Sequence, residues 1–390
     1  MKLDKRSFFF HNAKKQDIVF SIVVLLLCVV MYQIPTGFEN RLPENAEYTE
    51  AVVLSVDNSR AELHGLVRSG SQGLDVKILK GKWKDQVFHT GNIYMGKMEI
   101  DREFEPGDHA FVTISYNGET ITNVNTSDFY RLRSEAILMG IFALFLLLYG
   151  GFFGFQAILS FIFSTFVMWK LMIPLMLKGY DPILLSFAAV VVLSAAILFL
   201  VAGLNKKGVV ALLGASIGLG VTMIITLIFT GPFKINGAVR PFSETLLYAG
   251  NTHLDLTRLF IAGVVLSASG AVMDLAMDIS AAMNEIVKNK PDISRTNLLI
   301  SGNTIGRSVI GTMTTTLLFA YSGSYLAMVM LFMGQGIPNG NLLNISYVAA
   351  EILHTVAGSF GLVLVAPITT ATGAILYVPL YKKQRGIKHE

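Results

Sequence analysis

The chain has 390 residues, of which 53% are hydrophobic and 15% are charged, and its formal net charge is +4. A charged fraction well below the roughly 25% of soluble domains, together with a mean hydropathy of +0.56, is typical of an integral membrane protein. The Lys and Arg residues lie mostly in short clusters beside apolar segments, which argues against nucleic acid as a partner.

A basic N-terminal segment precedes the first apolar run, which extends from Ile18 to Ile34. About 17 apolar residues can just span the hydrocarbon layer. No small-x-small cleavage site follows, so residues 1–35 are expected to form a cytoplasmic segment and an uncleaved transmembrane anchor. The single cysteine, Cys28, lies in this run, and an intramolecular disulfide is therefore excluded.

Residues 36–134 change to a mixed polar composition. Short alternating runs such as EAVVLSV, LDVKIL and HAFVTIS are separated by turn signals such as EPGD and YNGE. This pattern predicts five or six strands in a small β domain, either a barrel or a sandwich. The pattern leaves open whether the domain binds a membrane or envelope protein.

Seven further apolar segments follow, at about 136–153, 156–177, 183–203, 209–232, 257–284, 308–333 and 351–380. With the first anchor they predict an α-helical polytopic membrane protein of about eight transmembrane helices, with the β domain inserted after the first helix. The predicted bundle of seven helices covers 135–381, and a basic tail covers 382–390. The least distinct boundary between two predicted spans is the glycine-rich turn LLLYGGFFGFQ, which separates the first two of these seven segments.

Basic residues predict the orientation, because loops rich in Lys and Arg stay in the cytoplasm. With the N-terminus inside, three basic clusters fall on the cytoplasmic side: 206–207, 288–295 and 382–388. The loop 335–350, predicted outside, contains neither Lys nor Arg. The loop 233–256, also predicted outside, contains Lys234 and Arg240, which is weak evidence against this orientation. We expect a multi-pass membrane protein with both termini in the cytoplasm and the β domain outside.

Two aspartates, Asp274 and Asp278, lie one helical turn apart inside the apolar run SASGAVMDLAMDISAAMNEIVKNK. At 100° per residue they share one side of a helix with Ser267 and Glu285, and the opposite side is aliphatic. Two neighbouring carboxylates favour a shared or exchangeable proton. Because charge in hydrocarbon costs about 2.5–3.5 kcal/mol, we expect Asp274 to face the bundle interior. Asp278 faces the interior or the interface, and Glu285 is expected at the inner surface.

The next apolar span begins with further polar residues. Arg307 either pairs with Asp278 or Glu285 across the hairpin or acts as a positive-inside anchor. Thr314 and Thr315 belong to a patch of hydroxyl groups. Such hydroxyls either line a substrate pathway or bond carbonyl groups of their own helix.

Three more polar residues lie near apolar segments. Lys170 either extends its amine outward beside Trp169 or pairs with a carboxylate of the aspartate helix. Glu351 and His354, at i and i+3, can hold a metal or relay a proton, although an interfacial hydrogen bond is the simpler expectation. No further Cys or His accompanies them, and no metal or cofactor is expected.

Four stretches carry a resemblance to a known family: LKGKWKDQVFHTGN, FEPGDHAFVTIS, SASGAVMDLAMDISAAMNEI and GNTIGRSVIGTMTTTLLFAYSG. Over nearly the whole chain the sequence resembles the YibE/F-like family of bacterial integral membrane proteins, which has no established biochemical activity. The run from Gly270 to Glu285, followed by Arg307, is also similar to a helix hairpin of the RND superfamily and related export subunits. That resemblance implies that Asp278 and Asp274 couple proton movement to the work of an extracytoplasmic domain.

Two functions are therefore expected from the sequence. One is a proton- or sodium-coupled transporter or export-associated protein that uses the two aspartates on an unknown small molecule, ion or peptide. The other is a non-transporting accessory or scaffold protein whose β domain binds a partner. An enzyme is not expected, because aspartyl proteases join carboxylates from different elements and no phosphate-binding GxxxxGKS loop occurs. The lipid bilayer is a partner in either case.

Overall fold

The computed structural model describes residues 15–39 and 45–384. Their contacts divide the chain into two compact units: Gly37–Phe145 forms one, and the described residues of Met1–Thr36 and Leu146–Glu390 form the other. We call them the β unit and the helical unit. The basic N-terminal segment before Lys15 and the part of the predicted basic tail after Gln384 lie outside the described residues.

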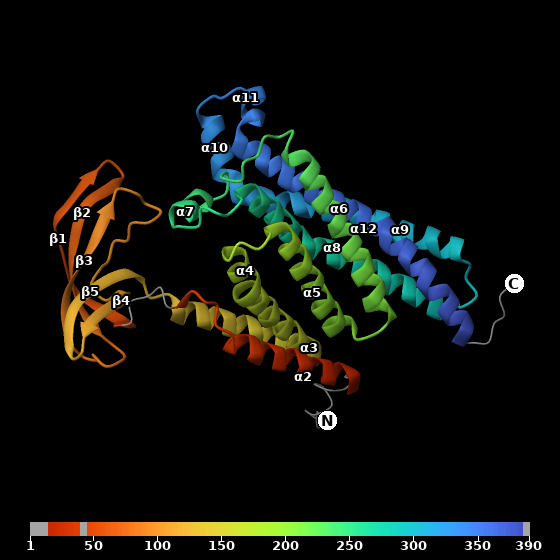
Figure 1. Cartoon of the computed structure of the whole chain (residues 1–390), viewed down its shortest axis with the longest axis horizontal. Helices are drawn as coiled ribbons and strands as arrows, with labels where there is room; N and C mark the ends of the chain where they lie inside the picture. Colours follow the sequence, from red (N-terminus) through yellow and green to blue (C-terminus); the bar gives the residue numbers. More distant parts are fainter. Residues whose placement is uncertain (1–14, 40–44, 385–390) are drawn as a thin grey trace. The chain divides into compact units, whose positions relative to one another are not determined.

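The β unit contains a five-stranded antiparallel sheet in the order β3-β2-β1-β4-β5 (Figure 1). Its strands are β1 (Ala46–His64), β2 (Val67–Ile78), β3 (Val87–Met95), β4 (His109–Asn117) and β5 (Thr120–Phe129). The two outer strands approach each other, since Thr90 Oγ1 of β3 donates to the Val124 carbonyl of β5 at 2.8 Å. The sheet is thus barrel-like, which confirms the predicted small β domain and favours the barrel over the sandwich.

Alternating side chains of the strands fill the core of the β unit. Val53, Leu74 and Val112 are at most 1% exposed. Gln72, also fully buried, donates from Nε2 to the Phe104 carbonyl at 2.9 Å and accepts from the Phe104 N–H at 3.1 Å. This paired contact satisfies a buried amide and fixes the connection between β3 and β4 over the core.

Two ion pairs stabilise the β unit. Arg102 Nη2 lies 2.7 Å from Asp128 Oδ2, and Lys80 Nζ lies 2.8 Å from Glu50 Oε2. The hydrogen bond from Arg102 lowers the pKa of Asp128 to about 2, and the bond from Lys80 holds the pKa of Glu50 below its usual value. The stability of the β unit therefore depends on these carboxylates remaining charged.

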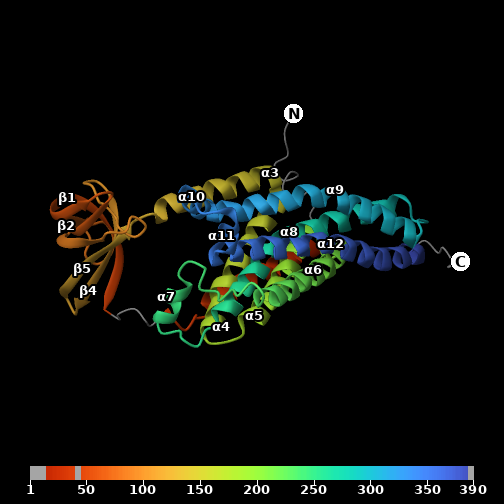
Figure 2. The ribbon, with the colours of Figure 1, turned by 90° about the horizontal axis from the view of Figure 1, so that it is seen from above.

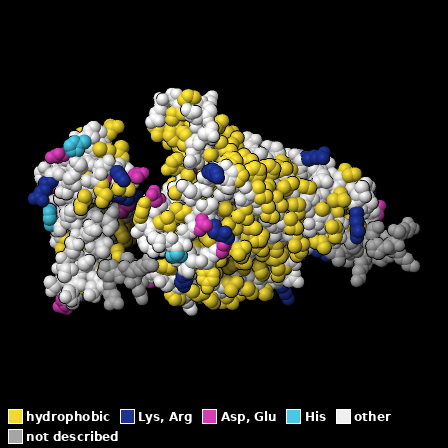
Figure 3. Space-filling view, turned by 45° about the horizontal axis from the view of Figure 1, so that its top comes forward, with side chains coloured by type: hydrophobic (Ala, Val, Ile, Leu, Met, Phe, Trp, Pro, Cys, Tyr) yellow, Lys and Arg dark blue, Asp and Glu magenta, His cyan; other side chains and the backbone are white. Residues whose placement is uncertain are grey.

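Seven helical stretches of the described chain are long and apolar enough to cross a membrane, judged by length and composition. Five are single helices: α2 (Lys15–Gln33), α5 (Pro182–Ala202), α6 (Lys206–Thr230), α8 (Leu256–Asn289) and α12 (Ser346–Gln384). The others are α3 (Leu132–Phe166) continued by a π-helix (Val167–Met172) and α4 (Ile173–Leu177), and α9 (Arg295–Ser322) continued to α10 (Leu326–Gly334). Hydrophobic side chains cover much of the helical face drawn in Figure 3. Two short helices, α7 (Ser243–Tyr248) and α11 (Asn339–Asn344), lie in connections.

The predicted number of eight spans differs from these seven stretches at residues 132–177. The two spans predicted there follow each other without a loop over 46 residues, as two helices that meet at Gly151. Gly151 has non-helical torsion angles, φ 53° and ψ −124°. A Cβ atom on Gly154 would lie 1.9 Å from the Leu146 carbonyl oxygen, more than one helical turn back in the sequence. The chain must therefore reverse at Gly151, where the glycine-rich turn was expected.

Helices α6, α8 and α12 lie side by side around the main core (Figures 1 and 2). The aliphatic side of α8 is fully buried there, with Val272, Leu275 and Ile279 at 0% exposure. Small residues allow close contact, since a Cβ atom on Gly361 of α12 would lie 1.8 Å from Thr222 Oγ1 of α6. This packing fixes the rotation of α8 about its axis and turns the opposite side of the helix away from the core.

Candidate functional site

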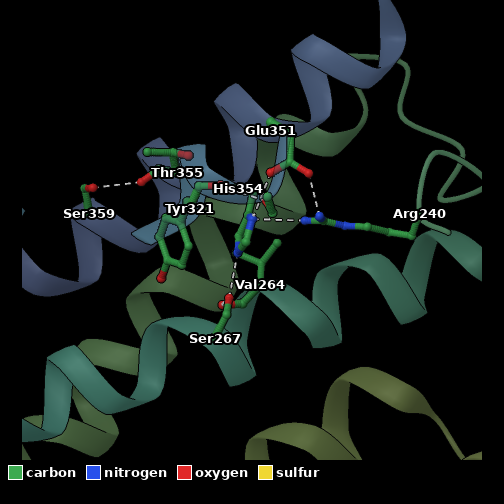
Figure 4. A network of polar contacts seen from close by, with 9 residues as sticks. Arg240, Val264, Ser267, Tyr321, Glu351, His354, Thr355 and Ser359 are labelled. Atoms are coloured by element: carbon green, nitrogen blue, oxygen red, sulfur yellow. Dashed lines mark hydrogen bonds and ion pairs between the residues drawn. The ribbon is translucent and has the colours of Figure 1, made fainter. Parts of the chain in front are cut away.

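A hydrogen-bonded network joins α8, α12 and the loop after α6 (Figure 4). Arg240 of this loop donates from Nη1 to Glu351 Oε1 at 2.5 Å and from Nη2 to His354 Nδ1 at 3.0 Å. On the other side of the imidazole, His354 Nε2 lies 2.6 Å from Ser267 Oγ of α8. We call Arg240, Ser267, Glu351 and His354 the Arg240–His354 network.

The donors of the network determine the tautomer of His354. A guanidinium can only donate, so Nδ1 accepts and the neutral imidazole carries its hydrogen on Nε2. Nε2–H then donates to Ser267 Oγ, whose hydroxyl donates to the Val264 carbonyl at 3.0 Å. A proton on Nδ1 would break the contact with Arg240 and leave Glu351 Oε2, 3.4 Å away, as the acceptor. The observed contacts therefore hold a neutral imidazole between Arg240 and Ser267.

The network is largely shielded from solvent. The side chains of His354 and Glu351 are 10% and 12% exposed, and that of Arg240 is 30% exposed. Tyr321 of α9 packs on His354 with ring centroids 4.3 Å apart, and the Arg240 guanidinium lies 5.3 Å from the centre of the Phe260 ring. Low dielectric around charged groups strengthens their hydrogen bonds and makes the loss of any one partner costly.

The acidic stripe of α8, formed by Ser267, Asp274, Asp278 and Glu285, lies opposite the buried aliphatic side. All four residues are exposed on the surface of the helical unit, and a Cβ atom on Gly270 between them would meet nothing within 4 Å. The expectation that Asp274 faces the bundle interior is therefore corrected, because α6 and α12 pack on the aliphatic side. Within the described ranges, neither Asp274 nor Asp278 forms an ion pair or hydrogen bond through its carboxylate.

Ser267 belongs to both the network and the stripe. Asp274 follows it by seven residues, which corresponds to two turns, about 10.5 Å, on the same side of α8. The structure thus brings Glu351 and His354 to one end of the acidic stripe. This connection between α12 and α8 could not be seen in the linear spacing of the residues.

Arg307 does not form the predicted charge pair. Among the described residues it makes no ion pair with the stripe, and Glu285 instead pairs with Lys288 at 2.7 Å. The rotation of α9 explains this difference: a Cβ atom on Gly306 would lie 2.9 Å from Ala366 Cβ, so Gly306 faces α12. Arg307, one residue later, points to a different and exposed side of the helix.

Thr314 and Thr315 bond carbonyl groups of their own helix. Thr314 Oγ1 donates to the Ile310 carbonyl at 2.8 Å, and Thr315 Oγ1 donates to the Gly311 carbonyl at 3.3 Å. Both line a groove of about 380 Å³ between α9 and α12. The structure places these hydroxyls beside α12 and does not join them to the acidic stripe.

Lys170 contacts α2 and not the acidic stripe. Its Nζ donates to the Ile34 carbonyl at 3.1 Å, just after the end of α2, where a cation is favoured by the helix dipole. Lys170 lies in the π-helix before Pro174, in which the Ile173 N–H donates to the Met168 carbonyl five residues back. The proline lacks an N–H, and the wider turn accommodates it.

Two residues of the site escaped sequence reasoning as functional candidates. Arg240 stood out only as a basic residue in a loop expected outside, and Tyr321 gave no signal at all. Glu351 and His354 bind Arg240, and no group of three or more His, Cys, Asp or Glu in the described ranges could hold a metal ion.

By length and composition the apolar helices are those of a polytopic membrane protein, and a small β unit follows the first of them in the chain. Comparison with known families gave two matches. The YibE/F-like protein family matches residues 138–379, and the YibE/F family N-terminal domain matches residues 47–129. The chain therefore belongs to the YibE/F family, as its motifs indicated. No curated protein and no solved structure gave a significant match.

Proposed function

We propose that this protein is an ion-coupled transporter or export-associated membrane protein in which Asp274 and Asp278 exchange a proton or a sodium ion. The supporting observation is that both carboxylates lie far from the ends of α8 without a cationic partner among the described side chains. Asp274 lies about 27 Å along a helix of about 51 Å. A carboxylate at this depth must be protonated, hydrated or ion-bound to avoid a cost of about 2.5–3.5 kcal/mol.

The Arg240–His354 network favours a proton as the coupling ion. His354 Nε2–H donates to Ser267 Oγ, which lies on the same side of α8 as Asp274, and rotation of the Ser267 hydroxyl away from the Val264 carbonyl would direct a donor toward Asp274. In this proposal, water between Ser267 and Asp274 completes the path. Protonation of His354 Nδ1 transfers its hydrogen bond from Arg240 to Glu351, so proton uptake is coupled to the position of the loop that carries Arg240.

We place both termini in the cytoplasm of a bacterial cell and the β unit outside. The support is the distribution of basic residues, since Lys206 and Lys207 lie in the first turn of α6 and Lys288 and Lys290 lie at the end of α8. The Arg240–His354 network then lies toward the outer end of α8. Protons would enter there and pass inward along the acidic stripe.

The test is proton flux in vesicles that contain the purified full chain and a pH-sensitive dye, driven by an imposed membrane potential. We expect the wild-type chain to conduct protons above empty vesicles and Asp274→Asn/Asp278→Asn to be slower by about tenfold or more. Asp292→Asn is the matched control, because Asp292 is an exposed carboxylate beyond the end of α8 and outside the acidic stripe. Sodium dependence of the flux would assign the ion. Equal flux in the wild type and the double variant would contradict the proposal.

A second candidate function is a scaffold that acts through the β unit. Its support is a group of exposed apolar side chains near the turn between β1 and β2: Leu66, Ile93, Met95 and Met98 are 69–87% exposed. Exposed apolar groups of this kind often mark protein interfaces. Crosslinking in membranes with and without residues 46–129 tests this function. A scaffold loses its partner on deletion and shows no proton flux in either form.

We propose no enzymatic activity for the chain. Asp274 and Asp278 lie on one helix, whereas carboxylates that activate a water molecule between them converge from separate elements. An assay for proteolysis of the chain's own β unit after reconstitution would contradict this proposal if Asp274→Asn abolished a cleavage seen in the wild type.

A further inference from the structure

A polar cavity of about 570 Å³ lies at the end of the helical unit where α2 and α6 begin and α5 and α8 end. Three lysines line it: Lys206 and Lys207 from the first turn of α6, and Lys288 from the last turn of α8. We call it the lysine cavity. The lysine cavity lies at the C-terminal end of α8, beyond Glu285. It is separate from the Arg240–His354 network, which contacts α8 nearer its N-terminal end.

Two of the lysines lie where a helix dipole already contributes positive charge. The first turn of α6 carries the positive end of the helix dipole, which disfavours cations such as Lys206 and Lys207. Lys288, which also pairs with Glu285 at 2.7 Å, approaches the same space from α8, and the carboxylate of Asp17 is among the lining residues. A bound anion would relieve this repulsion, as in basic pockets between membrane helices that hold phosphate headgroups.

The cavity also has a wall of hydrogen-bond acceptors. Gln156 of α3 lines it and is only 1% exposed, and its Oε1 has no hydrogen-bond partner within residues 15–39 and 45–384. Asp17 also lines the cavity and lies against Gly203, where an added Cβ atom would be 2.9 Å from Asp17 Oδ1. Gly203 has a positive φ of 78°, so only glycine suits both its torsion angle and this close contact. A ligand for this wall must bring a hydrogen-bond donor.

An apolar groove of about 300 Å³ adjoins the cavity between α2 and α3. Gln156 Nε2 donates to Ser21 Oγ at 3.4 Å, and Ser21 lines the groove, so Gln156 stands between the two spaces. The remaining lining of the groove is entirely hydrophobic: Ile18, Ile22, Leu25, Leu147, Phe152 and Phe155. A polar space at the helix end thus lies next to an apolar one along the helices, with Gln156 and Ser21 between them.

We propose that the lysine cavity binds the headgroup of a phospholipid whose acyl chain lies in the groove between α2 and α3. The phosphate lies near Lys206, Lys207 and Lys288, and a donor at the end of the headgroup meets Gln156 Oε1 and Asp17. The headgroup chemistry is a phosphate diester with an ammonium or hydroxyl donor. The proposal does not depend on ion coupling, because none of its residues belongs to the Arg240–His354 network or the aspartate pair.

Native mass spectrometry of the delipidated full chain tests the proposal with added lipids. Phosphatidylglycerol and phosphatidylethanolamine carry a donor and should bind about tenfold more tightly than phosphatidylcholine, whose headgroup has none. Glycerol phosphate, which lacks acyl chains, should bind weakly. Equal binding of all three lipids, or binding of glycerol phosphate as tight as that of phosphatidylglycerol, would overturn the assignment to a phospholipid.

Two variants locate the site. Lys206→Ala/Lys207→Ala should weaken phosphatidylglycerol binding about tenfold, while the matched control Lys178→Ala, at the other end of the helical unit, leaves it unchanged. Gln156→Leu should reduce phosphatidylglycerol binding to the level of phosphatidylcholine and keep or raise the unfolding temperature, because a buried acceptor without a partner is removed. Unchanged lipid binding in both variants, or binding lost only together with folding, would contradict the site.

Discussion

Removing the guanidinium of Arg240 should destabilise the helical unit more than removing the whole ion pair. In Arg240→Met, Glu351 keeps a charged side chain that is only 12% exposed and loses its bond of 2.5 Å. Breaking a buried pair by removing one partner costs about 3–5 kcal/mol. Because the Arg240 side chain is 30% exposed and water screens part of the charge, we expect a loss of about 2–3 kcal/mol.

The double variant Arg240→Met/Glu351→Leu removes both charges and should lose only about 1 kcal/mol, since apolar side chains can replace a buried pair at little cost. The assay is reversible unfolding in mixed micelles, followed by the fluorescence of Trp169 in the helical unit. Trp83→Phe removes the signal of the β unit. If the two single losses simply add in the double variant, Arg240 and Glu351 do not interact energetically and the network is wrongly assigned.

Three further predictions concern other parts of the chain. The Asp128 pKa of about 2 lies below the usual value of 3.8, so its contribution of about 2 kcal/mol is present above pH 4 and lost as the pH falls toward 2. Unfolding of the β unit with falling pH is followed by Trp83 fluorescence in a Trp169→Phe background. Its free energy of unfolding should depend less steeply on pH in Asp128→Asn than in the protein with Asp128. An identical pH dependence in both would contradict the lowered pKa of Asp128. Lys170→Met should cost about 1 kcal/mol or less and leave proton flux unchanged, whereas a large loss of flux would show that Lys170 does act with the stripe. Gly154→Ala should prevent normal folding because its Cβ would overlap the Leu146 carbonyl, while Gly150→Ala, with open space around it, should be tolerated; equal yields of folded protein would refute the chain reversal.

The fold was largely predictable because its signals are local. Strand alternation and turn residues predicted the β unit, and long apolar runs predicted the membrane helices. The reversal at Gly151 was also visible as a glycine-rich turn. What local pattern does not give is the way in which the two helices are joined, since the reversal depends on the torsion angles of Gly151 alone.

The site was predictable only within one helix. The angular relation of Ser267, Asp274 and Asp278 follows from helix periodicity and is confirmed. Which way that side points depends on the packing of other helices, and the exposure of Asp274 was therefore mispredicted. The same holds for Arg307, whose direction is set by the contact of Gly306 with Ala366 of α12.

Contacts across long sequence separations were the least predictable. Lys170 bonds the Ile34 carbonyl, and backbone carbonyls carry no sequence signal. Arg240 lies in a loop more than a hundred positions before its partners Glu351 and His354. A loop basic residue is ordinarily solvated, so only the folded structure shows that it completes the network.

The central claim is that the Arg240–His354 network and the acidic stripe form one proton path through Ser267. The most direct measurement compares proton flux in Ser267→Ala, Asp274→Asn and the double variant, in the same vesicles and at the same potential. If the groups act in series, Ser267→Ala slows the flux and the double variant is no slower than Asp274→Asn alone. If the two single reductions multiply in the double variant, or if Ser267→Ala conducts like the wild type, the two features act independently and the claim is contradicted.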